Sequence, residues 1–79
     1  MALLNKDAFK AVEKGRNHVH EPVEATYTEF TKNGRQFFQI DTFGTSGREV
    51  PGKISQSVQL DMEMAKILIS KLRKAFSLD

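Results

Sequence analysis

The periodicity of apolar residues changes along the chain, and each change marks a predicted element. From residue 23 to residue 60, β-branched and aromatic residues alternate with polar ones, as in strands that have one buried face. From residue 62 to about 76, apolar residues recur every three or four positions without Gly or Pro, which predicts a helix with Asp61 as its N-cap. A shorter helix is predicted over residues 6–14, capped by Asn5 and stopped by Gly15. The pattern predicts an α+β fold: an antiparallel meander of three to four strands followed by a long C-terminal helix, with a short N-terminal helix.

The most specific local signal is the Asn33-Gly34 pair between two strand-like runs. Both residues tolerate the positive φ that a type I′ turn requires, so we predict a hairpin over residues 24–43. We expect a single domain, in which residues 1–22 form the N-terminal helix and a connector, residues 23–60 the sheet and residues 61–76 the final helix.

A loop is predicted after the hairpin, over residues 44–52, with room for a short strand around residues 48–50. Residues 53–60 then alternate between polar and apolar side chains and predict a further strand. Gln56 interrupts the apolar face of this strand, which indicates a bulge or an edge position.

The predicted C-terminal helix is apolar over a wider arc than a single contact with a sheet needs. Its main stripe consists of Ala65, Leu68, Ile69, Leu72 and Phe76, and Met64, Ile67 and Ala75 widen it. A chain of 79 residues, 39% of them hydrophobic and none of them Cys or Trp, can build only a small core and has no disulfide to support it. We therefore expect a homodimer formed through this helix.

Charge and hydropathy narrow the choice of partner and compartment. The apolar start of the chain, residues 1–4, is too short for a signal peptide, and the run at residues 67–69 is too short to cross a bilayer, so a cytoplasmic protein with no membrane partner is expected.

The net charge of +2 is weakly basic. Four cations, Lys32, Arg35, Arg48 and Lys53, fall in the middle of the chain, where they could present a basic face to an anionic partner.

No catalytic constellation is recognisable, so we predict a protein that is not an enzyme. The Ser and Thr residues lack an identifiable base and the motif of a nucleophile elbow. His18 and His20 would lie on one side of an extended segment, but no carboxylate or Cys with matching spacing accompanies them, which favours surface histidines and no metal or other cofactor. The loop at residues 44–48 is suited to a nonspecific phosphate contact and equally to a plain hairpin loop, because it lacks the spacing of a P-loop.

Aromatic residues occupy both faces of the predicted strand at residues 36–43. Phe38 and Ile40 fall on one face, and Phe37 and Phe43 on the other. If Phe38 and Ile40 face the core, the other two rings lie outside, near the cations. Rings that stack on bases and cations that contact phosphates are what a protein needs to hold single-stranded nucleic acid. In the alternative, the same rings pack beneath the N-terminal helix, across strands or at a dimer interface.

The run from Pro51 to Asp61, PGKISQSVQLD, brings a glycine- and lysine-containing loop into a strand that ends at the cap of the final helix. With the order of the elements, this run resembles the single-stranded-DNA-binding transcriptional coactivators of the positive-cofactor-four type, over roughly residues 23–76. The resemblance implies a nucleic-acid face on the concave surface of the sheet and a dimer through the C-terminal helix, where it would use Ile67, Leu68, Lys71 and Leu72. The N-terminal helical segment and the modest net charge depart from the family pattern.

The sequence therefore predicts a homodimeric nucleic-acid-binding module that prefers single-stranded DNA or RNA and has low sequence specificity. Its phosphate contacts would be Lys32, Arg35, Arg48 and Lys53, and its stacking residues Phe37, Phe43 or Tyr27. The alternative is a small protein-interaction domain, such as an adaptor or a phage-type inhibitor, that uses the same aromatic face or a strand edge. Salt would separate the two, since phosphate contacts weaken as salt rises and an apolar interface does not.

Overall fold

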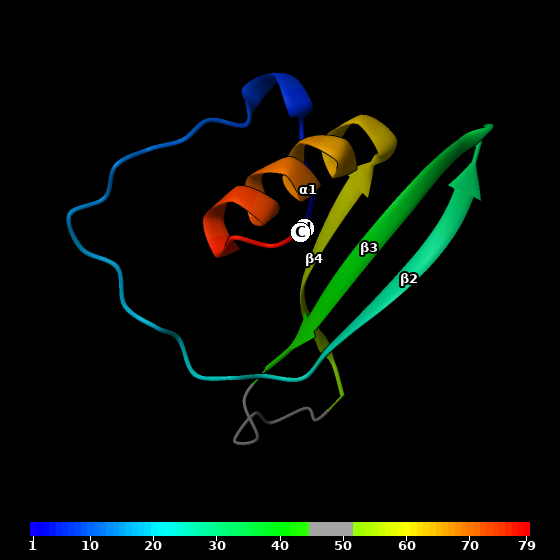
Figure 1. Ribbon diagram of the computed structural model, residues 1–79. Helices are drawn as coiled ribbons and strands as arrows, with labels where there is room; N and C mark the ends of the chain where they lie inside the picture. Colours follow the sequence, from blue (N-terminus) through cyan, green and yellow to red (C-terminus); the bar gives the residue numbers. More distant parts are fainter. Residues whose placement is uncertain (45–51) are drawn as a thin grey trace.

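A computed structural model describes residues 1–44 and 52–79 of the chain (Figure 1). The elements in chain order are β1 (Ala2–Leu3), the 3-10 helix η1 (Lys6–Ala8), β2 (Ala25–Lys32), β3 (Arg35–Phe43), β4 (Ile54–Asp61) and α1 (Met62–Phe76). The four strands form one sheet in the order β1-β4-β3-β2, in which β2, β3 and β4 are an antiparallel meander. The predicted α+β fold is confirmed. The strand predicted around residues 48–50 lies outside the described residues.

The β2–β3 hairpin turns at the predicted pair. Asn33 has a φ of 53° and Gly34 a φ of 77°, as a type I′ turn requires, and Lys32 pairs with Arg35 directly across the turn. This turn determines the register of the whole hairpin, because every further pair of residues follows from it.

A bulge lies between β3 and β4, close to Gln56. Thr42 pairs with Gln56, but the next residue, Phe43, pairs with Ile54, so Ser55 has no residue opposite it. The interruption that Gln56 makes in the sequence pattern therefore marks a real irregularity, as predicted.

The N-terminal helix is much shorter than predicted. Asn5 caps it as expected, since its side chain accepts a hydrogen bond from the backbone N–H of Asp7, but the helix ends at Ala8. Residues 9–24 contain no helix or strand and run as a wide open loop from η1 to β2 (Figure 1). The apolar stripe that the longer helix would have had is too narrow to be held by packing, because Val12 stays exposed and Phe9 is only partly covered.

Strand pairing holds the start of the chain against the body. Ala2 and Leu3 form a short parallel strand against Val58 and Gln59, a pairing that the sequence pattern does not indicate. In η1, Lys6 donates to the Asp7 carboxylate, and this hydrogen bond together with the charge of Asp7 raises the pKa of Lys6 above its ordinary value.

Helix α1 begins where it was predicted and packs on the sheet at β4. The Asp61 carboxylate accepts from the backbone N–H of Met64 at 2.9 Å, which is the expected N-cap. Among the described residues, Leu60 and Met64 are the only buried apolar side chains. The core is therefore small, and the β2–β3 hairpin extends well beyond the helix (Figure 1). In residues 1–44 and 52–79, no helix is long and apolar enough to cross a membrane.

The two faces of the sheet differ in chemistry. Phe38 and Leu60 lie opposite each other on one face and line a hollow with Ala65 of α1, so this is the face that the helix covers. Because side chains alternate along a strand, Phe37, Gln39 and Asp41 project from the other face. We call the latter the open face.

Candidate nucleic-acid interface

An aromatic pair stands at the hairpin end of the open face. Phe30 of β2 and Phe37 of β3 are cross-strand partners whose rings stack with centroids 5.2 Å apart and planes at 24°. The guanidinium of Arg35 lies 5.0 Å from the centroid of the Phe37 ring, in a cation–π contact. Phe30 was not among the predicted stacking residues. The Asn33-Gly34 turn could have identified it, because the register of that turn places Phe30 opposite Phe37.

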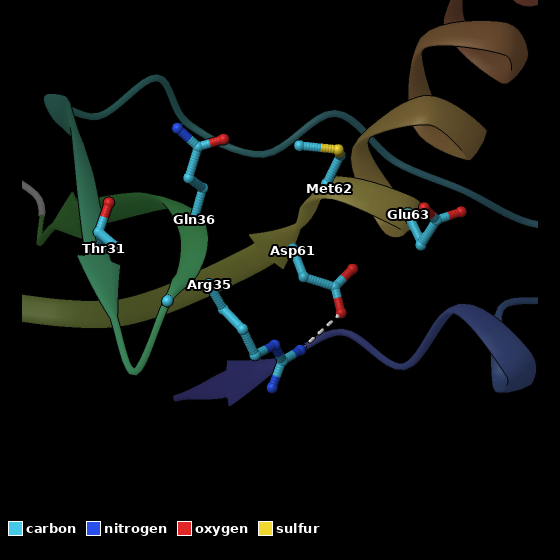
Figure 2. A pocket seen from close by; sticks show the side chains of 7 residues that line it. Thr31, Arg35, Gln36, Asp61, Met62 and Glu63 are labelled. Atoms are coloured by element: carbon cyan, nitrogen blue, oxygen red, sulfur yellow. Dashed lines mark hydrogen bonds and ion pairs between the residues drawn. The ribbon is translucent and has the colours of Figure 1, made fainter.

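Arg35 is held from two sides. Besides its contact with Phe37, its Nη2 donates to the Asp61 carboxylate at 3.1 Å across the end of the sheet. In Figure 2 these two side chains point to one side of the strands, whereas Thr31 and Gln36 point to the other. A cavity of about 450 Å³ lies at these strand ends, beside the first turn of α1. Glu63 also lines this cavity. With two carboxylates in its wall, this cavity is not suited to a phosphate.

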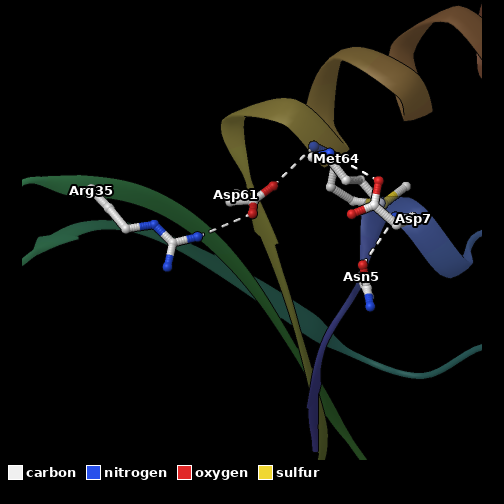
Figure 3. Close-up of polar contacts among 6 residues, drawn as sticks. Asn5, Asp7, Arg35, Asp61 and Met64 are labelled. Atoms are coloured by element: carbon white, nitrogen blue, oxygen red, sulfur yellow. Dashed lines mark hydrogen bonds and ion pairs between the residues drawn. The ribbon is translucent and has the colours of Figure 1, made fainter.

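Asp61 links three elements at this end of the molecule. One carboxylate oxygen accepts from Arg35 of β3 and the other caps α1 at Met64 (Figure 3). Because Asp61 is itself the last residue of β4, the ion pair joins β3 to the point where β4 becomes α1. The guanidinium is therefore positioned by the fold, and more than half of the Arg35 side chain remains exposed to a ligand.

A row of hydrogen-bonded polar side chains continues along the open face. Gln59 Nε2 donates to Gln39 Oε1 at 2.7 Å, and Gln39 Nε2 donates to Asp41 Oδ1 at 2.9 Å. Ser57 Oγ also donates to Asp41 Oδ1. Asp41 keeps only 7% of its surface exposed and is the one buried charged residue in the described part of the chain. Sequence analysis did not identify this row, which depends on the pairing of β3 with β4.

A cavity of about 250 Å³ connects the rings to the polar row. Its walls are the Phe30–Phe37 pair, Lys32, Gln59 and Leu3 of β1. It combines aromatic and aliphatic walls with one amide and one ammonium group. This combination suits a flat heterocycle that has hydrogen-bonding atoms on its edge and an anionic substituent.

The predicted site residues lie near the two ends of β3. Lys32, Arg35 and Phe37 lie together at the hairpin end. Phe43 follows Phe37 by six positions along β3, which is about 20 Å, and Lys53 adjoins the residue opposite Phe43. Arg48 lies outside the described residues.

Tyr27 cannot join the other predicted stacking residues. It pairs with Ile40 on the face that α1 covers and stacks on Phe38 there, with centroids 5.3 Å apart and planes at 19°. Since 70% of Tyr27 is exposed, it belongs to a second aromatic surface on the opposite side of the sheet. The alternation of side chains along β2 separates it from Phe30, three positions away.

The histidines form no recognisable metal site. The rings of His18 and His20 are 4.6 Å apart in an edge-to-face arrangement within the open loop. Nowhere in residues 1–44 and 52–79 do three or more His, Asp or Glu side chains gather as metal ligands would.

The fold and the site define a small α+β domain whose sheet carries a ring pair, two cations and a polar row on one open face. Comparisons with protein-family models, curated proteins and solved structures find no match to this chain.

Proposed function

We propose that the protein is a non-enzymatic nucleic-acid-binding module that binds single-stranded DNA or RNA along the open face of its sheet. The observation that carries the proposal is the Phe30–Phe37 pair with Arg35 against it and Lys32 across the turn. Aromatic rings and guanidinium groups both stack on bases, whatever the sequence, and the ammonium and guanidinium groups bind phosphate. The order β2-β3-β4-α1 is also the order that the resemblance to the positive-cofactor-four coactivators implies.

The charges on the face favour stacking over phosphate contacts as the main source of affinity. At the hairpin end and along the polar row, Lys32 and Arg35 are balanced by Asp41 and Asp61. Both carboxylates accept hydrogen bonds from protein groups, so they are partly neutralised toward a ligand. A strand of nucleic acid along β3 would contact the ring pair at one end and Phe43 and Lys53 at the other.

We propose that the module acts as a homodimer. Apolar residues along α1, namely Ile69, Leu72 and Phe76, are 49%, 41% and 68% exposed, while the core contains few fully buried side chains. A second copy packed on this stripe would bury the apolar surface that one chain of this size leaves uncovered. Of the residues predicted for the interface, Ile67 and Leu68 are half-buried, and Lys71 and Leu72 are exposed.

A second candidate function is that of a protein-interaction domain. It is favoured by the position of β2, an eight-residue strand at the edge of the sheet, and by the exposed Tyr27 on the side of α1. An extended peptide could add to this edge as a further strand, with Tyr27 as an anchor.

Fluorescence anisotropy with labelled single-stranded oligonucleotides at several salt concentrations tests the proposed function. We expect binding at low salt that weakens as salt rises, because each phosphate contact releases condensed counterions. If neither DNA nor RNA strands bind at low salt, the nucleic-acid proposal is wrong. Binding that does not respond to salt would also contradict the phosphate contacts.

A further inference from the structure

The polar row of the open face buries a charged group where the fold does not need one. Asp41 is almost fully buried, although a chain with so small a core gains little from placing a carboxylate in the middle of its sheet. The carboxylate accepts from Gln39 and Ser57, and Gln39 in turn accepts from Gln59. This arrangement orders a line of side chains that leads from Asp41 toward the cavity beside the rings.

The chemistry of the row determines which way each amide points. An ionised carboxylate can only accept hydrogen bonds, so Asp41 requires the nitrogen of the Gln39 amide. The oxygen of Gln39 is thereby directed at Gln59, which must offer its own nitrogen in return. Within residues 1–44 and 52–79, the Gln59 oxygen and the second hydrogen of its nitrogen have no hydrogen-bond partner. The orientation of Gln59 is therefore a consequence of the charge on Asp41.

Gln59 is also the one member of the polar row that lines the cavity beside the ring pair. The other walls are Phe30, Phe37, Lys32 and Leu3. A base that enters this cavity would contact the rings and Leu3 and bring its edge to the Gln59 amide, while Lys32 is available to its phosphate.

We propose that this cavity binds a single nucleobase and that Gln59, oriented by Asp41 through Gln39, recognises the major-groove edge of that base, with adenine preferred. The proposal rests on the proposed function, since it assigns a base preference to one position of the bound strand. Gln59 would contact the base directly, whereas Gln39 and Asp41 are positioning residues.

Adenine fits the amide best at its major-groove edge. A glutamine amide presents an acceptor beside a donor and pairs with the N6 donor and the N7 acceptor of adenine. On the same edge guanine shows two acceptors, cytosine only the N4 donor, and thymine only the O4 acceptor beside its methyl group. Adenine is thus the one base that matches both atoms of the amide on that edge.

The test compares four labelled oligonucleotides of equal length and mixed sequence that differ in one central base. We expect the wild-type protein to bind the adenine-containing strand roughly fivefold more tightly than the others, the lower end of what one amide–base pair contributes. The variant Gln59→Ala should bind all four strands with equal affinity and still bind them. Equal binding of the four strands by the wild type, or a preference that persists in Gln59→Ala, would overturn the proposal.

Two further variants test the orienting role of Asp41. Asp41→Asn can present either an oxygen or a nitrogen to Gln39, and Gln39→Met removes the link while keeping a similar volume. Both should reduce the preference for adenine to less than twofold while the mean affinity for the four strands changes little. A purely structural role would instead lower the affinity for all strands equally and leave the preference intact. Because Asp41→Asn could unfold, Gln39→Met provides the same comparison without altering the buried charge.

The outcomes separate this proposal from the one on which it rests. If no strand binds, the proposed function fails and the base preference fails with it. If strands bind in a salt-dependent manner but without distinction between bases, the function stands and only the role of Gln59 is wrong.

Discussion

Arg35 Nη2 lies 3.1 Å from Asp61 Oδ2, so the first residue of β3 is bound to the last residue of β4. The same carboxylate caps α1, and the same guanidinium contacts the Phe37 ring. The pair thus connects the start of the helix with the ring pair of the candidate interface. The Asp61 carboxylate therefore has two separable roles, as a helix cap and as the partner of an ion pair.

Removing the Asp61 side chain should destabilise the domain through the helix cap more than through the ion pair. Asp61→Ala loses both, and we expect a decrease of about 1 to 2 kcal/mol in the free energy of unfolding, measured by chemical denaturation. Asp61→Asn keeps a capping oxygen and loses only the charge, so it should cost about 0.5 kcal/mol or less. Equal losses in the two variants would show that the cap contributes nothing.

The stability of the hairpin turn should depend on the backbone conformation of Gly34 and not on the space around it. Its φ is 77°, and nothing lies within 4 Å of the position that a Cβ would take, so Gly34→Val is strained without being crowded. We expect a loss of about 1 kcal/mol or more in unfolding free energy. Gly15→Ala is the control, because Gly15 lies in the open loop with equally empty surroundings and should leave the denaturation midpoint unchanged. An unchanged midpoint for Gly34→Val would contradict the turn.

The exposed stripe of α1 should mediate association. Leu72→Asp places a charge in it and should convert a dimer into a monomer, as measured by light scattering after size-exclusion chromatography. Val19→Asp is the matched control, since Val19 is almost fully exposed in the open loop, away from the helix, and its replacement should leave the molar mass unchanged. A wild-type protein that stays monomeric at high concentration would contradict the dimer.

The ring pair of the open face should bind bases, and the ring pair of the opposite face should not. Phe37→Ala is expected to weaken binding to a single-stranded oligonucleotide by about 1 to 3 kcal/mol, the contribution of one stacked base. Tyr27→Ala truncates the exposed member of the other stacked pair and should leave the affinity within about 0.5 kcal/mol of wild type.

Thermal unfolding of both ring variants provides the control for that comparison. Phe37 is half-buried, so its truncation also costs packing, and the affinity has to be measured where the variant is still folded. A Tyr27→Ala variant that loses as much affinity as Phe37→Ala would move the interface to the other face or support the protein-interaction alternative.

Cations that contact phosphates should contribute to the salt dependence of binding affinity. Lys32→Ala is expected to reduce the slope of log affinity against log salt by about 0.7, the number of counterions that one phosphate of a single strand releases. Lys66→Ala is the control, since Lys66 lies on α1 beside Glu63 and away from the open face. Equal slopes for the wild type and Lys32→Ala would exclude Lys32 as a phosphate contact.

The local elements of this protein could be predicted because each depends on neighbouring residues. Asn33 and Gly34 can adopt the φ angles of their turn, and Asp61 caps the helix that follows it, whatever the rest of the chain does. The hairpin, the final helix and the bulge near Gln56 were therefore visible in the sequence. The same turn also implies that Phe30 lies opposite Phe37, since the register of the hairpin follows from it.

The tertiary structure decided what depends on residues distant in sequence. Leu3 pairs with Gln59 and Gln39 donates to Asp41 only because β1, β3 and β4 meet in one sheet, and no periodicity within a single strand reports such pairings. It also ended the N-terminal helix at Ala8, because a narrow apolar stripe forms a helix only where another surface covers it. Alternation in the sequence determined which side chains share a face. Which face the helix covers, and hence which rings remain open to a ligand, was decided by the packing of α1 on β4, since burial depends on the whole fold.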